Sequence, residues 1–489
     1  MSLKKQAAKG GLWISITRTG INIVDFIVFA YLARILTLED FGLVAFCLLF
    51  IEFANIAVNA GVNQNIVQRK TWDEGYASST LIYVAGLASC VALFLVFIGA
   101  PIAQYAHSTT AAYVVMSLAP ITVLMSLQVV FNGKLVRDFK NKQMGIAKFI
   151  ASVISGVVVI ITAEIDFGLW SLVIGRLVNA ILELGLLSYI SRFKPTLHYN
   201  KADKQELVQF CMPLLGGALL SMAHQRATSL FTGLVLGPAS FALLNAAKKG
   251  EQMINQITMS SINSMVVPSF ARAKAGANLG DLYIKLVAIT ATLVLPIFMG
   301  LAAIADPFVI IAFGEKFSDS AVFMSISAFA MLPGVLGWFL PTLLISQAKT
   351  QDAFKLSLLS VISSAVVAAA TIWFGITTML AAIVVANFLM LPIRFKIVMK
   401  HISIDIKKLI VSVFPQYICA FGMFICIMLC KVFLDTHISN DILLLITLIL
   451  VGILSYIILC FAFFYKSTHI QVKEIKNMFL KTGKVHTQN

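Results

Sequence analysis

Long apolar stretches separated by short polar segments run through the whole chain. A helix that crosses a membrane needs roughly 20 mostly apolar residues. Fourteen stretches meet this requirement, and the pattern predicts an all-α, polytopic membrane protein with about 14 transmembrane helices. These predicted spans lie at 12–33, 41–63, 77–100, 112–133, 146–164, 168–189, 212–236, 240–265, 284–305, 319–346, 354–374, 376–393, 410–431 and 441–465.

The segments between these spans alternate in charge. One set carries 29 of the 37 lysines and arginines, while the other set carries mostly acids. Basic loops stay on the cytoplasmic side of a membrane, so the alternation predicts that both termini are cytoplasmic. The basic segments are 1–11, 64–76, 134–148, 190–211, 266–285, 347–355, 394–409 and 466–489.

The two halves of the chain resemble each other at an offset of 200 residues. ILTLEDFGL at 35–43 aligns with VLGPASFAL at 235–243, and Asn55 aligns with Asn255. Transporters are often built from such repeats, with the substrate site at the repeat interface. We predict an N-terminal six-helix bundle at 1–205, a C-terminal one at 206–400, two additional helices at 401–465 and a basic cytoplasmic tail at 466–489.

Nine ionisable residues fall inside the predicted spans, where each would cost about 2.5–3.5 kcal/mol facing lipid. They are Arg18, Asp25, Glu52, Arg176, Glu183, Arg226, Lys248, Lys249 and Glu251. The third, fifth, eleventh and fourteenth spans have no charge in their interiors. This contrast favours an internal cavity lined by selected helices, in which the charges pair or meet water.

These charges share helix faces with amides, because residues three, four or seven positions apart lie on one side of a helix. Arginine holds phosphate oxygens in pairs, and amides suit sugar hydroxyls, so the faces indicate a cavity for a glycan carrying phosphate. Ion pairs that join helices, such as Arg18 with Asp25 or Arg176 with Glu183, are an alternative. The stripes are Arg18, Asn22 and Asp25; Glu52, Asn55, Asn59 and Asn63; Arg176, Asn179 and Glu183; and Lys248, Gln252, Asn255 and Asn263.

The sequence carries no enzyme or metal motif beside these stripes. It has no P-loop, no Ser–His–Asp pattern and no HExxH,. Its seven cysteines lie in apolar runs without metal-ligand spacing to histidine, so neither a metal nor a cofactor is predicted,. The net charge of +15 is spread between the spans rather than gathered on one domain, which argues against a nucleic-acid partner.

Four segments carry a resemblance to a known family: KGGLWISITRTGINIVDFIVFAYLARILTLEDFGLVA, GKLVRDFKNKQMGIAKFIASVISGVVVI, FGLWSLVIGRLVNAI and VVPSFARAKAG. In their order and spacing the chain resembles the polysaccharide-transporter branch of the multidrug/oligosaccharidyl-lipid/polysaccharide exporter superfamily, especially the WzxC-like lipopolysaccharide and exopolysaccharide flippases. The resemblance implies two six-helix bundles around a central cavity, with two peripheral helices. It also implies alternating access in the bacterial inner membrane, with a polyprenyl-pyrophosphate-linked oligosaccharide as cargo.

The stripes and the resemblance together give the predicted site. We expect the acids Asp25, Glu52 and Glu183 to be candidates for ion coupling. Membrane lipids and polysaccharide polymerase or export proteins are the expected partners of a monomeric chain. A cation-coupled multidrug exporter and a membrane-embedded glycan-processing enzyme are the alternative functions. The expected substrate-binding residues are Arg18, Asn22, Asn55, Asn59, Arg176, Asn179, Arg226, Lys248, Gln252 and Asn255.

Overall fold

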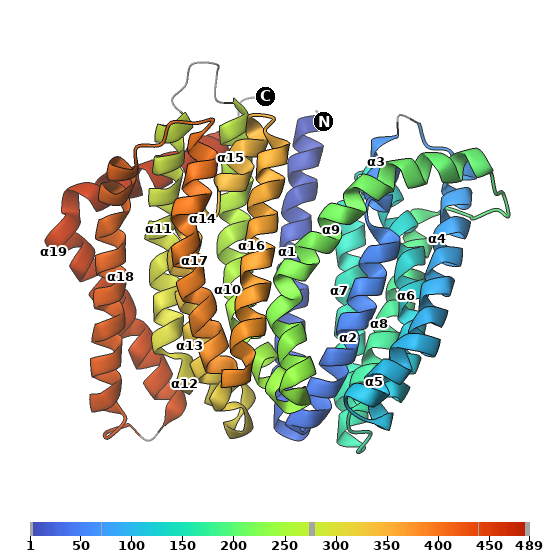
Figure 1. Cartoon of the computed structure of the whole chain (residues 1–489), viewed down its shortest axis with the longest axis horizontal. Helices are drawn as coiled ribbons and strands as arrows, with labels where there is room; N and C mark the ends of the chain where they lie inside the picture. The colour runs from blue at the N-terminus through green and yellow to red at the C-terminus, as the bar shows by residue number, and fades with distance from the viewer. Residues whose placement is uncertain (1–2, 70, 273–278, 439, 485–489) are drawn as a thin grey trace. The chain divides into compact units, whose positions relative to one another are not determined.

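The structure, a computed structural model, describes residues 3–69, 71–272, 279–438 and 440–484, and every regular element in these ranges is a helix (Figure 1). Thirteen helical stretches in this part of the chain are long and apolar enough to cross a membrane. They coincide with thirteen of the predicted spans, so the all-α, multi-pass membrane fold class is confirmed.

The remaining predicted span, 240–265, lies within α10 (Gly237–Arg272). This helix has 36 residues, which at 1.5 Å per residue reach about 54 Å,. α10 is not among the thirteen apolar stretches found in the described residues. Lys248, Lys249 and Glu251 fall within a single turn of it, and Gln252, Asn255 and Gln256 follow directly. The side chain of Asn263, the last member of its predicted stripe, lies outside the described residues.

The chain divides into two compact units, residues 1–242 and 243–489. Besides the start of α10, unit 1 contains α1 (Leu3–Ile35), α2 (Leu38–Asn59), α3 (Val62–Gln68), α4 (Glu74–Phe94), α5 (Ala100–Ala106), α6 (Thr109–Arg137), α7 (Asn141–Glu164), α8 (Trp170–Ser191) and α9 (Lys201–Val235). Besides the rest of α10, unit 2 contains α11 (Leu279–Ala303), α12 (Ala305–Phe313), α13 (Asp319–Phe329), α14 (Met331–Gly337), α15 (Leu340–Ser346), α16 (Thr350–Thr371), α17 (Ile376–Met399), α18 (Ile406–Leu434) and α19 (Asp441–Lys484).

Polar side chains fix where several helices of unit 1 begin. Thr37 accepts a hydrogen bond from the backbone N–H of Asp40 at the start of α2, and Ser108 accepts one from Ala111 at the start of α6. Asn200 does the same for α9. A helix leaves its first N–H groups without intrahelical partners, so these caps satisfy donors that would otherwise be exposed to the membrane interface.

Two predicted spans of unit 1 are interrupted helices. Gly61, with a φ of 85°, separates α2 from α3, and a left-handed residue of this kind ends a helix at little cost only when it lacks a Cβ,. A π-helical turn at Leu95–Gly99 joins α4 to α5. α9 contains Pro213, and Figure 1 shows this helix curving so that its first half passes the ends of α3 and α4.

α6 lies at the centre of unit 1, against α2, α3, α4, α5 and α8. Its buried face carries Val114 and Leu118, which belong to one apolar cluster of the unit, and Leu135, which belongs to another. α1 packs on α7, and α7 packs on α8. This arrangement brings the polar stripes predicted on α1 and α8 to the two sides of α7.

Gly42 is a position where unit 1 tolerates no side chain. A Cβ there would overlap the backbone carbonyl of Pro238, which cannot rotate away. We expect Gly42→Ala to destabilise the protein by about 3 kcal/mol, at the upper end for overpacking. Thermal unfolding in detergent checks this. Gly86→Ala in α4 is the matched control, because a Cβ there meets no atom within 4 Å, and an unchanged or raised unfolding temperature is expected for it. Equal behaviour of the two variants would contradict the prediction.

In unit 2, α11 is the helix around which the others pack. It contacts α13, α14, α18 and α19, and its apolar residues form one cluster with theirs. The predicted span 319–346 is divided into α13, α14 and α15. The two predicted additional helices are α18 and α19, which pack on each other and on α11. The helix α19 extends to Lys484, so the predicted basic tail 466–489 is helical over 466–484, and residues 485–489 are not described.

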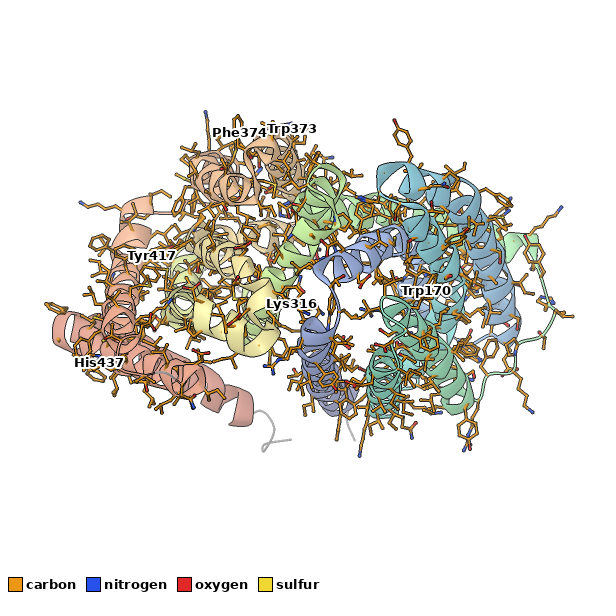
Figure 2. All side chains as sticks on the ribbon, turned by 90° about the horizontal axis from the view of Figure 1, so that it is seen from below. Trp170, Lys316, Trp373, Phe374, Tyr417 and His437 are labelled. Atoms are coloured by element: carbon orange, nitrogen blue, oxygen red, sulfur yellow. The ribbon has the colours of Figure 1, made fainter. Side chains whose placement is uncertain are left out.

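Aromatic side chains mark one end of unit 2. Trp373 and Phe374 lie at the tip that joins α16 to α17, at the periphery of the unit (Figure 2), and each is 74% exposed. Tryptophan is enriched at the level of lipid headgroups. The predicted topology places this tip on the outer side of the membrane.

Candidate functional site

The predicted site residues fall on five helices. All those on α1, α2, α8 and α9 belong to unit 1, and those on α10 belong to unit 2. Because α1, α7 and α8 pack in sequence, the stripes of α1 and α8 can meet only through side chains of α7. α7 carried no predicted site residue.

A chain of hydroxyl and amide groups connects α1 to α8 across α7. Ser152 Oγ donates to Asp25 Oδ1 over 3.4 Å, a long hydrogen bond. One turn further, Asn179 Nδ2 donates to Ser155 Oγ at 3.2 Å. Ser155 in turn donates to the carbonyl of Ser152 at 3.0 Å. Two predicted residues, Asp25 and Asn179, are thus connected by two serines that the sequence analysis did not select.

Lys148 of α7 forms an ion pair with Glu183 of α8, with Nζ and Oε1 2.9 Å apart. The expectation that the fifth span has no interior charge is therefore wrong. The charge pattern places Lys148 in the basic segment 134–148, but α7 begins at Asn141, so Lys148 lies two turns inside the helix. A signal was present in the sequence: Lys148, Ser152 and Ser155 follow the four- and three-residue spacing of one helix face,.

Arg18 of α1 and Arg176 of α8 are both exposed. Within the part of the chain that the structure describes, neither guanidinium has a hydrogen bond or an ion pair, so Arg18 does not pair with Asp25 and Arg176 does not pair with Glu183. Glu183 binds Lys148 instead. Two permanently charged groups inside spanning helices, each with five N–H donors, are therefore uncompensated by protein.

Glu52 of α2 and Arg226 of α9 form a two-pronged ion pair. Arg226 Nε lies 2.9 Å from Glu52 Oε2, and its Nη2 donates to Glu52 Oε1 at 3.1 Å. The paired geometry matches the planar fork of arginine to both carboxylate oxygens. Sequence analysis gave these residues separate roles, substrate binding for Arg226 and ion coupling for Glu52, whereas in this structure each neutralises the other.

We expect Glu52→Gln to lower the stability of the protein by about 1–2 kcal/mol, because Arg226 then loses charge-assisted hydrogen bonds while both groups are only partly buried. The double variant Glu52→Gln/Arg226→Gln should recover part of that loss, since it removes both charges together. Thermal unfolding of the two variants in detergent measures the difference. If the loss in the double variant equalled the sum of the losses in Glu52→Gln and Arg226→Gln measured separately, the pair would add nothing to stability.

Asn55 and Asn59 of α2 face α6. Asn59 Nδ2 donates to Ser126 Oγ at 3.1 Å and to Asn55 Oδ1, and Asn55 Nδ2 lies 3.4 Å from Met125 Sδ. Both amides are half-buried. Asn55 and Asn59 of the predicted α2 stripe therefore form polar contacts with α6. Glu52 of the same stripe contacts α9.

The predicted residues of α10 share one face of that helix. Lys248 and Asn255 are half-buried, and Gln252 is exposed. Because unit 2 begins at residue 243, these three side chains belong to unit 2.

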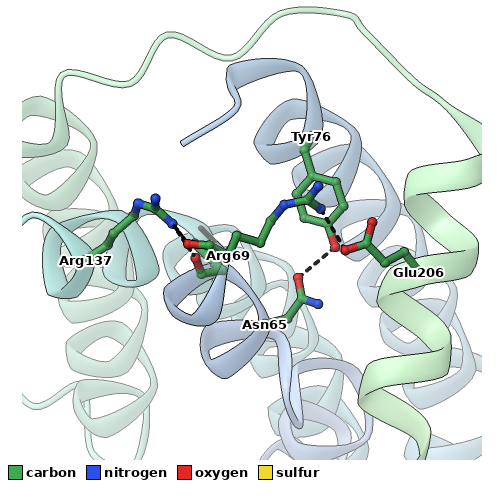
Figure 3. A network of polar contacts seen from close by, with 6 residues as sticks. Asn65, Arg69, Tyr76, Arg137 and Glu206 are labelled. Atoms are coloured by element: carbon green, nitrogen blue, oxygen red, sulfur yellow. Dashed lines mark hydrogen bonds and ion pairs between the residues drawn. The ribbon is translucent and has the colours of Figure 1, made fainter. Parts of the chain in front are cut away.

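A further polar network lies where α3 and α4 meet α9, and sequence analysis missed it (Figure 3). The guanidinium of Arg69 lies 3.4 Å above the ring of Tyr76 and forms an ion pair with Glu206 at 3.1 Å. The hydroxyl of Tyr76 donates to Asn65 at 2.7 Å, and Arg137 donates to the carbonyl of Arg69. These contacts fasten the first half of α9 to the α3–α4 connection. They join residues up to 137 positions apart, so no local spacing could have indicated them.

The packed helices α1, α7 and α8 carry Arg18, Asp25, Lys148, Arg176 and Glu183 inside the predicted spans. Lys148 and Glu183 neutralise each other, which leaves Arg18, Arg176 and Asp25. Arginine can bind an anion, and the serine and asparagine side chains of these helices can bind hydroxyl-rich groups. No group of three His, Cys, Asp or Glu side chains suited to a metal occurs in the described residues.

Comparison with known proteins gives a family match over more than half of the chain. The sequence model of a family described as polysaccharide biosynthesis protein matches residues 31–322. A succinoglycan biosynthesis transport protein, ExoT of Rhizobium meliloti, is 24% identical over 310 residues, which are 63% of this chain and 62% of that relative. The lipopolysaccharide biosynthesis protein WzxC of Escherichia coli is 22% identical over 362 residues, 73% of each chain.

Among solved structures, the lipid II flippase MurJ in an inward closed conformation aligns with a TM-score of 0.75 over 93% of this chain and 99% of that one. The identity is 13%. This similarity shows that the two proteins share a fold.

Proposed function

Because the chain belongs to the polysaccharide biosynthesis protein family, we propose that it is a flippase that translocates polyprenyl-pyrophosphate-linked oligosaccharides across the bacterial cytoplasmic membrane by alternating access. The cargo would serve the synthesis of a cell-surface polysaccharide such as lipopolysaccharide, capsule or exopolysaccharide. The observation that carries the proposal is that Arg18 and Arg176, inside spanning helices, have no partner among the described residues. The names of the relatives, a polysaccharide transport protein and a lipopolysaccharide biosynthesis protein, support it.

The proposed cargo has two polar parts that match two kinds of group on unit 1. Its pyrophosphate would bind a guanidinium fork, that of Arg18 or that of Arg176, since this planar group holds phosphate oxygens in pairs. Its sugar hydroxyls would exchange hydrogen bonds with side chains such as Asn179. Translocation requires no covalent chemistry, so we propose a transporter rather than an enzyme.

Of the three acids predicted for ion coupling, we propose Asp25. Glu52 and Glu183 are each held by a basic partner, whereas the polar contact of Asp25 among the described residues is with the hydroxyl of Ser152. A carboxylate without a basic partner is the one best able to bind a proton or a sodium ion. The membrane potential would act on the charged cargo in addition, at about 2.3 kcal/mol per charge per 100 mV.

We propose further that both termini are cytoplasmic. The distribution of basic residues supports this orientation, since basic loops are retained on the cytoplasmic side,.

Polysaccharide polymerase or export proteins of the same membrane are the proposed partners, together with the lipid-linked substrate.

The test of the function uses a strain that lacks the gene. Cells are fed labelled sugar, and the lipid-linked oligosaccharides are extracted after their membrane side has been determined with an impermeant reagent. We expect completed units to accumulate on the cytoplasmic leaflet and the wild-type gene to relieve this accumulation. Normal pools on the outer leaflet, together with a changed drug-susceptibility panel, would favour a multidrug exporter instead.

A further inference from the structure

Unit 2 contains a pocket that none of the candidate substrate residues lines. It encloses about 680 Å³ between α14, the last turns of α17 and the first turns of α18. Its inner wall is made of buried side chains, Leu391 and Phe395 of α17 with Leu409 and Val413 of α18. A volume of this size is typical of sites for small molecules or lipid chains.

The pocket offers almost no polar group along its wall. Among the described residues that line it, Tyr417 alone carries a hydroxyl group, and this residue projects from α18 (Figure 2). The hydroxyl already donates to the carbonyl of Leu332 in α14. The wall therefore suits an unbranched apolar chain and gives no support to a sugar or a nucleotide.

The rim of the pocket is basic. Lys396 and Lys400 line it one helical turn apart at the end of α17, and both are exposed,. Within the described residues neither ammonium group has a hydrogen bond or an ion pair. By contrast, two other lysines of the predicted cytoplasmic segments are paired, since Lys408 binds Asp281 and Lys355 binds Asp352. A cationic rim above an apolar pocket is complementary to a molecule with an anionic head and an apolar tail.

The position of the pocket along the membrane identifies the source of such a molecule. Lys396 and Lys400 belong to the segment 394–409, which the distribution of basic residues assigns to the cytoplasmic side,. Anionic phospholipids give the cytoplasmic leaflet its negative surface, and basic pockets between spanning helices on this side recognise their headgroups.

We propose that this pocket is a binding site for an anionic glycerophospholipid of the cytoplasmic leaflet. The lipid phosphate lies between Lys396 and Lys400, and one acyl chain fills the space lined by Phe395, Leu409 and Val413. Because its walls come from three helices, a bound lipid connects α14, α17 and α18. Ligands that bind the folded state stabilise it by mass action, so unit 2 gains stability in membranes rich in such lipid.

The experiment measures lipid binding to the full-length purified protein by native mass spectrometry. Phosphatidylglycerol and phosphatidylcholine with identical acyl chains are the probes, so that only the headgroup charge differs. The test variant is Lys396→Gln/Lys400→Gln. The matched control is Lys194→Gln/Lys349→Gln, which removes two exposed lysines of the same predicted side that do not line the pocket.

We expect the wild-type chain and the control to prefer phosphatidylglycerol and to unfold at a higher temperature in its presence. The test variant should lose roughly 30-fold in affinity for this lipid and keep its affinity for phosphatidylcholine, as expected for two lysines near an anionic headgroup. A third variant, Ile410→Trp, places a ring at the exposed rim and should weaken binding of both lipids.

Three results would overturn the proposal. Equal binding of the two lipids to the wild-type chain would show that the two lysines do not recognise an anionic headgroup. An equal loss of affinity for phosphatidylglycerol in the control variant would show that the lipid is attracted by the basic side of the protein as a whole and not by this pocket. Displacement of phosphatidylglycerol by polyprenyl phosphate at equimolar amounts would assign the pocket to the carrier lipid of the proposed cargo. Failure of the proposed transport function would change none of these measurements.

Discussion

Replacing Arg18 and Arg176 together by alanine is expected to slow translocation of lipid-linked oligosaccharide at least about 100-fold. Each charge-assisted hydrogen bond contributes about 1.5–3 kcal/mol, and 1.4 kcal/mol corresponds to a factor of ten. Loss of one such bond to the cargo at each site therefore amounts to two to four powers of ten. The rate at which labelled cargo reaches the outer leaflet, compared at equal protein level, is the measurement.

The double variant should fold, because neither arginine has a partner in the described structure that its removal would leave unsatisfied. Removing an unpaired charge from a spanning helix is expected to raise stability, since such a charge is costly there. Loss of transport with an unchanged or raised unfolding temperature would thus separate cargo binding from a structural role. A variant that transports at the wild-type rate would refute the assignment of the phosphate site.

Lysine substitutions test whether the shape of the guanidinium matters or only its charge. Arg18→Lys/Arg176→Lys keeps both charges but loses the planar fork that binds two oxygens at once. We expect an intermediate rate, about tenfold below wild type. Arg192→Ala is the matched control, because Arg192 is also exposed but lies at the end of α8, outside the polar face. It should transport normally.

The sequence predicted the spans well because the membrane imposes a strong local rule. Every backbone group must be satisfied within a helix of sufficient length, and hydropathy reports that length directly. The positions at which helices are interrupted within a span, in contrast, depend on single residues. Gly61 permits the left-handed turn between α2 and α3, but it lies near the end of the predicted span 41–63, and no sequence signal indicated that a second short helix follows.

The partners within the site could not be predicted, because they depend on which helices pack together. Spacing places Arg176 and Glu183 on one face of α8, so the sequence alone was compatible with an ion pair between them. The packing of α7 on α8 instead brings Lys148 to Glu183. Likewise Glu52 could be placed on a polar face of α2, but its neighbour Arg226 lies 174 positions away, and no rule of local spacing connects the two.

Removal of Lys148 is the second substitution for which we expect a large effect. Lys148→Ala leaves the carboxylate of Glu183 without its partner, and only 17% of that side chain is exposed. An unpaired charge in a spanning helix costs about 2.5–3.5 kcal/mol, so we expect a loss of about 2–3 kcal/mol in the free energy of unfolding. The unfolding temperature of the purified protein measures it, and the level in the membrane should fall in parallel.

A double-variant cycle decides whether Glu183 serves structure or transport. Lys148→Ala/Glu183→Gln removes both charges, and because no charge is then left unpaired, more than half of the lost stability should return. If the pair only holds α7 against α8, transport should return with it. If Glu183 carries an ion during the cycle, stability will recover while transport stays low, since a glutamine cannot take up a proton or bind sodium as a carboxylate does. The two readouts together therefore separate an ion pair that joins helices from a coupling site, the choice that the spacing of the polar stripes left open.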